Sequence, residues 1–72
     1  MDNRIRELRT VRGMTQQELA DAVSVSSRTI ISLEKGQYNP SVLLAYRIAF
    51  VFGLSIEEVF LFGDEDSPGQ VV

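Results

Sequence analysis

The chain has 72 residues and a formal net charge of −3, and it contains neither cysteine nor histidine. This length allows one small domain. The missing residue types exclude disulfides, thiolate metal sites and the commonest general base, so we expect no catalytic residues, no metal and no cofactor. The charged N-terminus does not look like a signal peptide, and the longest apolar run is interrupted by Arg47. That run is shorter than the roughly 20 residues that span a bilayer, so we expect a soluble, cytoplasmic protein.

The charges are unevenly distributed along the chain. Residues 1–40 hold six basic and five acidic side chains, whereas residues 41–72 hold one basic and five acidic side chains. A negative net charge argues against a nucleic-acid partner, but the basic groups gather in the first half. Because the electrostatic field of these charges is weak, tight binding to nucleic acid would have to come from specific, well-fitted contacts.

The first half of the chain is predicted to form three short helices, at residues 3–11, 15–23 and 27–35. The second begins at a capping box, in which the side chains of Thr15 and Glu18 each bind the other residue's backbone amide. The third begins at a Ser26 cap. Gly13 and Gly36 follow the first and third helices as left-handed terminators.

The second half adds two predicted helices, at residues 41–52 and 55–62. Gly53 ends the fourth, and a second capping box with Ser55 and Glu58 begins the fifth. No strand alternation is visible, so the expected fold is all-α, a compact five-helix domain over residues 1–62. Residues 63–72, GDEDSPGQVV, are acidic and have little to bury, which predicts a disordered tail.

Residues 16–35 have the pattern of a helix-turn-helix. Ala20 allows two helices to approach closely, and residues 23–25 form a short corner. Apolar side chains occupy the positions that anchor such a motif, namely Leu19, Val23, Val25, Ile30 and Leu33.

Four segments together resemble one family of regulators, namely MTQQELADAV, VSVS, TIISLEKGQYNPS and FGLSIEEVF. The chain is similar over residues 3–62 to Cro/CI-type helix-turn-helix regulators, the lambda repressor-like or XRE family. The resemblance implies a five-helix module that binds operator DNA as a two-fold dimer, with its third helix in the major groove. Ser24 departs from the glycine usual at the corner, and a left-handed serine costs on the order of 1 kcal/mol.

The face of the third helix opposite Ile30 and Leu33 is the predicted reading surface. Its candidate contacts to base edges are Ser27, Arg28, Ile31 and Ser32. Arg28 suits guanine O6 and N7, and an outward Ile31 suits a thymine methyl group. The other interpretation is a solvated face with one stray isoleucine.

Further residues are candidates for phosphate contacts, namely Gln16, Thr29, Lys35, Gln37, Tyr38 and Asn39. Gln16 opens the second helix, where free amides favour an anion, and similar domains use this glutamine for backbone contact and for bracing the third helix. It can also be an ordinary exposed residue. For Tyr38 and Asn39 packing and loop shape are equal alternatives.

Arg9 and Glu34 are predicted to form a structural ion pair. Glu34 lies at the edge of the inward face of the third helix, where an unpaired carboxylate would be costly. In similar proteins an arginine of the first helix pairs with it, and Arg9 matches that position. Arg4, Arg6 and Arg12 could support the positive field that attracts DNA, but a solvated helix face is the expected place for them.

The helix at residues 41–52 is apolar on two sides, and a domain of this size cannot bury both. The surplus residues are Leu43, Tyr46 and Phe50, joined by Leu61 and Phe62. We expect them to form an isologous homodimer interface; the alternative is that they fold under the tail or stay exposed.

Two functions fit this pattern. The first is a sequence-specific DNA-binding regulator, a repressor acting by occlusion, that binds an inverted repeat in double-stranded DNA as a homodimer. The second is an antitoxin or adaptor that engages a protein partner through the apolar face or the acidic tail, which the weak charge field also suits. A toxin-sized neighbouring gene would favour the second.

Overall fold

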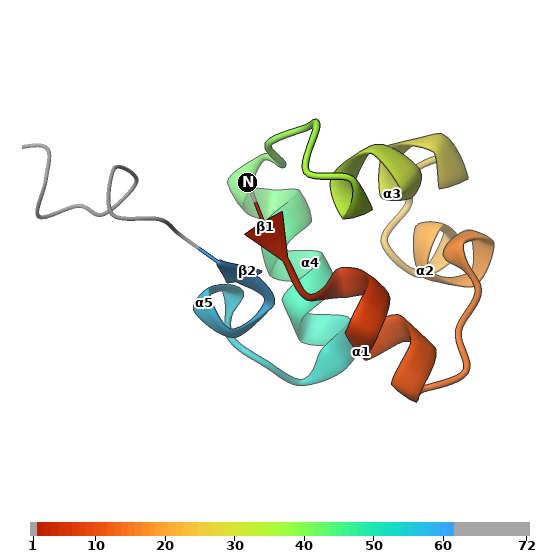
Figure 1. The fold of residues 1–72 in the computed structure, drawn as a ribbon, viewed down its shortest axis with the longest axis horizontal. Helices are drawn as coiled ribbons and strands as arrows, with labels where there is room; N and C mark the ends of the chain where they lie inside the picture. The colour runs from red at the N-terminus through yellow and green to blue at the C-terminus, as the bar shows by residue number, and fades with distance from the viewer. Residues whose placement is uncertain (1, 62–72) are drawn as a thin grey trace, which may run out of the picture.

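The computed structural model describes residues 2–61; Met1 and residues 62–72, which include Phe62 and the tail expected to be disordered, lie outside the described part. The elements follow in the order β1 (Asp2–Asn3), α1 (Ile5–Val11), α2 (Gln16–Ala22), α3 (Ser27–Glu34), α4 (Val42–Phe52), α5 (Ile56–Val59) and β2 (Phe60–Leu61). In Figure 1, α1 lies in front of the central α4, with α2 and α3 on one side and α5 and β2 on the other.

The helices α2 and α3 begin at the caps that the sequence predicts. In the Thr15 capping box the hydroxyl accepts from the Glu18 amide at 3.0 Å, and the Glu18 carboxylate accepts from the Thr15 amide at 2.8 Å. Ser26 and Ser41 cap α3 and α4 through their hydroxyls. Gly53 ends α4 with φ 68°, a left-handed conformation that glycine adopts without a Cβ clash. The predicted caps are therefore confirmed.

A second capping box begins α5. The hydrogen bond that Glu58 accepts from the Ser55 backbone, together with the Ser55 hydroxyl, lowers the pKa of Glu58. The carboxylate thus stays ionised at the helix start, where it satisfies an otherwise free amide.

The two ends of the described chain differ from the prediction. The first helix begins at Ile5 rather than at residue 3, and the fifth ends at Val59 rather than near residue 62. Residues 2–3 and 60–61 instead form two short antiparallel strands, with Asp2 opposite Leu61. Strand pairing satisfies the backbone beyond α5 and places Phe60 in the core, where it is buried.

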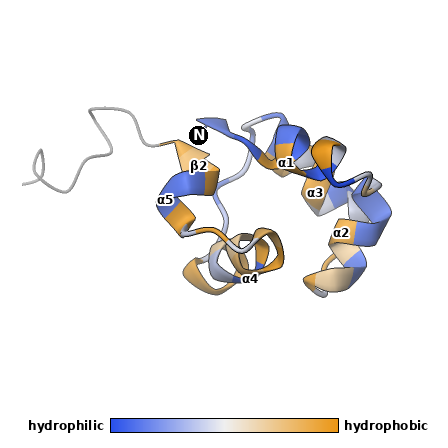
Figure 2. Cartoon of the chain, turned by 90° about the horizontal axis from the view of Figure 1, so that it is seen from below, coloured by the Kyte–Doolittle hydropathy of each residue, from blue (hydrophilic) through white to orange (hydrophobic). Residues whose placement is uncertain are grey.

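One apolar core joins all five helices. Its largest members are Phe52 and Phe60, and its members among the described residues are all apolar. Figure 2 shows α4 as a mostly hydrophobic helix, whereas α1 and α2 carry hydrophilic residues as well. None of the helices within residues 2–61 is long and apolar enough to cross a membrane.

A tight corner joins α2 to α3. Ser24 has φ 62°, and among residues 2–61 no other residue except glycine has a positive φ. The amide of Val25 donates to the Ala20 carbonyl at 3.0 Å, which turns the chain toward the Ser26 cap. Ala20 and Val23 are buried at this crossing. The left-handed corner expected from the sequence is present and uses serine.

We expect Ser24→Gly to raise the free energy of unfolding by up to about 1 kcal/mol, because glycine adopts this φ without strain. The gain is limited because glycine is also freer in the unfolded chain. Urea denaturation measures the effect. Ser24→Ala is the control, since it retains Cβ and should gain nothing. A Ser24→Gly protein no more stable than Ser24→Ala would contradict strain at the corner.

Candidate nucleic-acid interface

The side chains of α3 range from buried to exposed. Ile30 and Leu33 are buried, and Arg28 and Lys35 are exposed at opposite ends of the helix. The four other candidate contacts on this helix, Ser27, Thr29, Ile31 and Ser32, are half-buried. The expectation of an outward Ile31 is therefore only partly met.

Thr29 has an additional local role. Its backbone amide donates to the Ser26 hydroxyl at 3.3 Å, and its own hydroxyl lies 3.2 Å from that oxygen. The first turn of α3 is thus closed by side chains that also face the solvent near Arg28. This arrangement fixes the backbone from which Arg28 projects.

The segment after α3 is open to solvent. Gln37, Tyr38 and Asn39 are exposed, and within residues 2–61 their side chains make no hydrogen bond. The Gln37 amide donates to the Ser32 carbonyl at 3.1 Å, so the segment leaves the helix in a fixed direction. The side chains remain free to meet a ligand beside α3.

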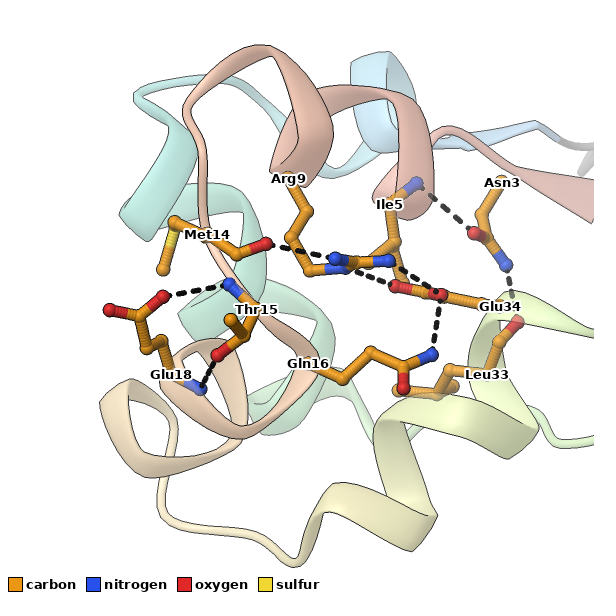
Figure 3. A network of polar contacts seen from close by, with 9 residues as sticks. All are labelled: Asn3, Ile5, Arg9, Met14, Thr15, Gln16, Glu18, Leu33 and Glu34. Atoms are coloured by element: carbon orange, nitrogen blue, oxygen red, sulfur yellow. Dashed lines mark hydrogen bonds and ion pairs between the residues drawn. The ribbon is translucent and has the colours of Figure 1, made fainter.

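An ion pair and an amide hold the end of α3 (Figure 3). Arg9 Nε lies 2.8 Å from Glu34 Oε2, and Arg9 Nη2 donates to Glu34 Oε1 at 3.3 Å. Gln16 Nε2 donates to the same Oε1 at 3.0 Å, and Arg9 Nη1 donates to the Met14 carbonyl at 2.8 Å. The side chains of Arg9 and Glu34 are 14% and 6% exposed. The structure thus brings Arg9 and Glu34 together and adds Gln16, whose amide braces α3 from α2.

The Asn3 side chain makes two hydrogen bonds that the sequence did not lead us to expect. Its Nδ2 donates to the Leu33 carbonyl at 2.7 Å, and its Oδ1 accepts from the Ile5 amide at 3.1 Å (Figure 3). The bond to the Ile5 amide could have been predicted, because an asparagine side chain often accepts from the backbone amide two residues later. Nothing local indicated Leu33, which is 30 residues away.

Two arginines expected on solvated surface are bound within the fold. Arg12 Nη2 donates to the Phe52 carbonyl at 2.7 Å, and its guanidinium lies 5.1 Å from the centre of the Phe52 ring. Arg4 forms an ion pair with Glu7 at 3.0 Å and donates to the Glu58 carbonyl at 3.1 Å. Arg12 is exposed and the Arg4 side chain is 39% exposed, so both lie at the surface as expected, and the contacts within the fold are an addition to that expectation. They follow from the approach of α1 to the ends of α4 and α5.

A hollow of about 530 Å³ lies between α1, α2 and α3. The Arg9–Glu34 pair contributes to its wall, together with Arg6, Thr15, Gln16, Ile31 and Lys35. It therefore joins the start of α2 to the half-buried side of α3.

The apolar side chains on the outer side of α4 remain uncovered in the single chain. Leu43, Tyr46 and Phe50 are exposed, Phe50 by 71%, and the Tyr46 and Phe50 rings lie 6.1 Å apart. Leu61 on β2 is also exposed. Val42, 81% exposed at the start of α4, is an apolar residue that the sequence analysis did not include. Phe62 lies outside the described residues.

Within residues 2–61 no three acidic or other metal-binding side chains gather into a site for an ion. The features that can recognise a ligand are the exposed face of α3, the segment after it and the hollow beside it. These features carry arginine, lysine and amide groups. Such groups suit a nucleic acid, whose phosphates are negatively charged and whose base edges form hydrogen bonds.

Comparison with known proteins agrees with this geometry. Residues 5–59 match the Helix-turn-helix family. A protein of Archaeoglobus fulgidus named as an HTH-type transcriptional regulator is 56% identical over 97% of this chain and 100% of its own length. The transcriptional repressor RstR of the cryptic phage CTXphi, from Vibrio cholerae, is 32% identical over 79% of this chain and 51% of its own length.

Among solved structures, the restriction-modification controller protein C.AhdI from Aeromonas hydrophila superposes with a TM-score of 0.71. It is 31% identical, and the match covers 76% of this chain and 83% of that one. The five-helix, lambda repressor-like fold expected from the sequence is confirmed, with the small β1–β2 pair added to it.

We expect Arg9→Met to lower the free energy of unfolding by about 3 kcal/mol, because it leaves the Glu34 carboxylate buried without its cation. The double variant Arg9→Met/Glu34→Leu removes the stranded charge and should recover most of that loss. Urea denaturation of the wild type, the two single variants Arg9→Met and Glu34→Leu, and the double variant gives the coupling free energy between the two side chains. A loss below about 1 kcal/mol for Arg9→Met would mean that the pair behaves like an exposed one.

Proposed function

The chain belongs to the helix-turn-helix family and is a DNA-binding transcriptional regulator of the Cro/CI (XRE) type; from this premise we propose that it is a repressor that binds an inverted-repeat operator as a homodimer. Residues 1–62 form the DNA-binding unit, and α3 enters the major groove. Repression follows from occlusion of the promoter. The name of the Vibrio cholerae relative, a transcriptional repressor, supports this direction of regulation.

The observation that carries the proposal is the exposed, unpartnered Arg28 on a helix held from behind. Arg28 projects from the first full turn of α3, and no described residue binds its side chain. A guanidinium in this place can donate two hydrogen bonds to guanine O6 and N7. Ser27, Ile31 and Ser32 supply the smaller contacts to base edges beside it.

Phosphate contacts flank this reading surface. Lys35 and the exposed segment Gln37, Tyr38 and Asn39 follow the C-terminal end of α3, and Gln16 and Thr29 lie toward the start of α2 and α3. Such contacts fix the register of the protein on the duplex and carry no sequence information. Because Gln16 also binds Glu34, it would link a phosphate contact to the bracing of α3.

The homodimer is proposed from the outer side of α4. Leu43, Tyr46, Phe50 and Leu61 present an apolar surface that one small domain leaves in water. A two-fold axis through this surface would bury it against itself and present two copies of α3 to one face of the DNA. Half-sites about one helical turn apart follow from that symmetry.

The test of DNA recognition is selection of bound duplexes from a random library, at about physiological salt. We expect enrichment of a two-fold symmetric site. With Arg28→Ala, the preference at one base position per half-site should relax, at a cost of about 1–3 kcal/mol. If no sequence is enriched even at low salt, the exposed face of α3 does not read DNA.

The test of the dimer is sedimentation at tens of micromolar. We expect Phe50→Glu to shift the protein to monomer, because a carboxylate would be desolvated at the centre of the interface. Val11→Glu is the control, since Val11 is 80% exposed on α1 and gains the same charge. A wild type that sediments as a monomer, or a dimer unaffected by Phe50→Glu, would contradict this interface.

A further inference from the structure

The four arginines of the first twelve residues do not share one role. Arg4, Arg9 and Arg12 are each bound to groups within the fold. Arg6 is exposed, and its side chain has no hydrogen bond or ion pair with any described residue. It nevertheless lines the hollow between α1, α2 and α3. A free guanidinium beside a cavity is available to a ligand in a way that its three neighbours are not.

The charge around the hollow favours an anion. Glu34 is the acidic residue of its wall, and both of its oxygens accept hydrogen bonds from Arg9. The ion pair therefore leaves little net charge there. Arg6 on one side and Lys35 on the other contribute two cations without partners among residues 2–61. The resulting positive field is concentrated where the walls exclude part of the solvent.

The polar groups of the hollow also suit phosphate oxygens. Gln16 uses one amide hydrogen for Glu34 and keeps a second hydrogen for another acceptor. Arg6 can present two parallel N–H groups, which match the two free oxygens of a phosphodiester. The ammonium group of Lys35 acts as a point charge from the end of α3.

We propose that this hollow binds one phosphodiester of the DNA backbone, with Arg6 holding it from α1 and Lys35 from α3. The proposal rests on the function proposed above, and it adds α1 to the DNA-contacting elements. Because a free phosphate ion has the same chemistry, the assignment to DNA has to be separated from binding of the ion alone.

The salt dependence of DNA affinity tests this role directly. Each phosphate neutralised by the protein adds about 0.9 to the slope of log K against log salt. Because the proposed dimer carries one Arg6 in each protomer, we expect Arg6→Gln to reduce the magnitude of the slope by about 1.8, for the operator and for unrelated duplexes alike. Equivalently, the ratio of the wild-type affinity to the Arg6→Gln affinity should shrink about 12-fold as salt rises from about 50 to about 200 mM.

Arg47→Gln is the matched control. Arg47 is also exposed and unpartnered within the described chain, but it lies on α4 and not in the hollow. It removes the same charge and should leave the slope unchanged, provided that sedimentation shows both variants in the wild-type oligomeric state. Equal slope changes for the two variants would reduce the effect to net charge and overturn the site.

A double variant tests whether Arg6 and Lys35 share one phosphate. For a shared phosphate, the loss of affinity in Arg6→Gln/Lys35→Gln should be smaller than the product of the two single losses. Losses that multiply would assign the two side chains to separate phosphates and overturn the shared site.

Failure of the proposed function and failure of the proposed phosphate site give different experimental results. Wild-type protein that binds no duplex at low salt overturns the proposed function and this site with it. Wild-type protein that binds its operator, with an unchanged slope for Arg6→Gln, overturns only the site. Titration of the free ¹⁵N-labelled protein with inorganic phosphate completes the test. Saturable shifts at Arg6, Gln16 and Lys35 that Arg6→Gln abolishes, with no change in the DNA slope, would assign the hollow to a free anion instead.

Discussion

The Glu34 carboxylate holds three helices at one point, and the rest of the recognition surface depends on it. It belongs to α3, and it accepts hydrogen bonds from Arg9 of α1 and Gln16 of α2. With 6% of its side chain exposed, removing it from water is costly, and the guanidinium and amide offset that cost. A satisfied polar cluster permits one relative placement of these helices. The direction in which Arg28 leaves α3 is set by that placement.

The arginines that bind groups within the fold leave few cations available to a ligand. Arg4 and Arg12 bind carbonyl groups of α5 and α4, so they support the architecture and not a ligand. The cations left without partners in the described chain are few, and Arg6, Arg28 and Lys35 among them lie on or beside α3. In the function proposed above, recognition depends on the positions of these few cations, because the net charge of −3 provides no general attraction to DNA.

The β1–β2 pair connects two regions that the helices alone leave apart. Leu61 of the proposed dimer surface lies opposite Asp2, and the next residue, Asn3, donates to the Leu33 carbonyl near the end of α3. The backbone of β1 therefore pairs with β2, and the Asn3 side chain binds α3. In this way β1 joins Leu61 on β2 to the C-terminal half of α3.

The sequence by itself determined the three central helices and the caps, because these depend on interactions within about four residues or on helical periodicity. The left-handed corner at Ser24 was implied by the resemblance to the Cro/CI family. It also indicated which side of α3 faces the solvent and is proposed to read DNA, since the buried positions Ile30 and Leu33 define the opposite side. Only the tertiary structure decided the strand at Phe60, the bond from Asn3 to Leu33 and the stacking of Arg12 on Phe52. Each of these joins groups at least 30 residues apart. Such contacts are set by the packing of whole elements, which no local pattern encodes.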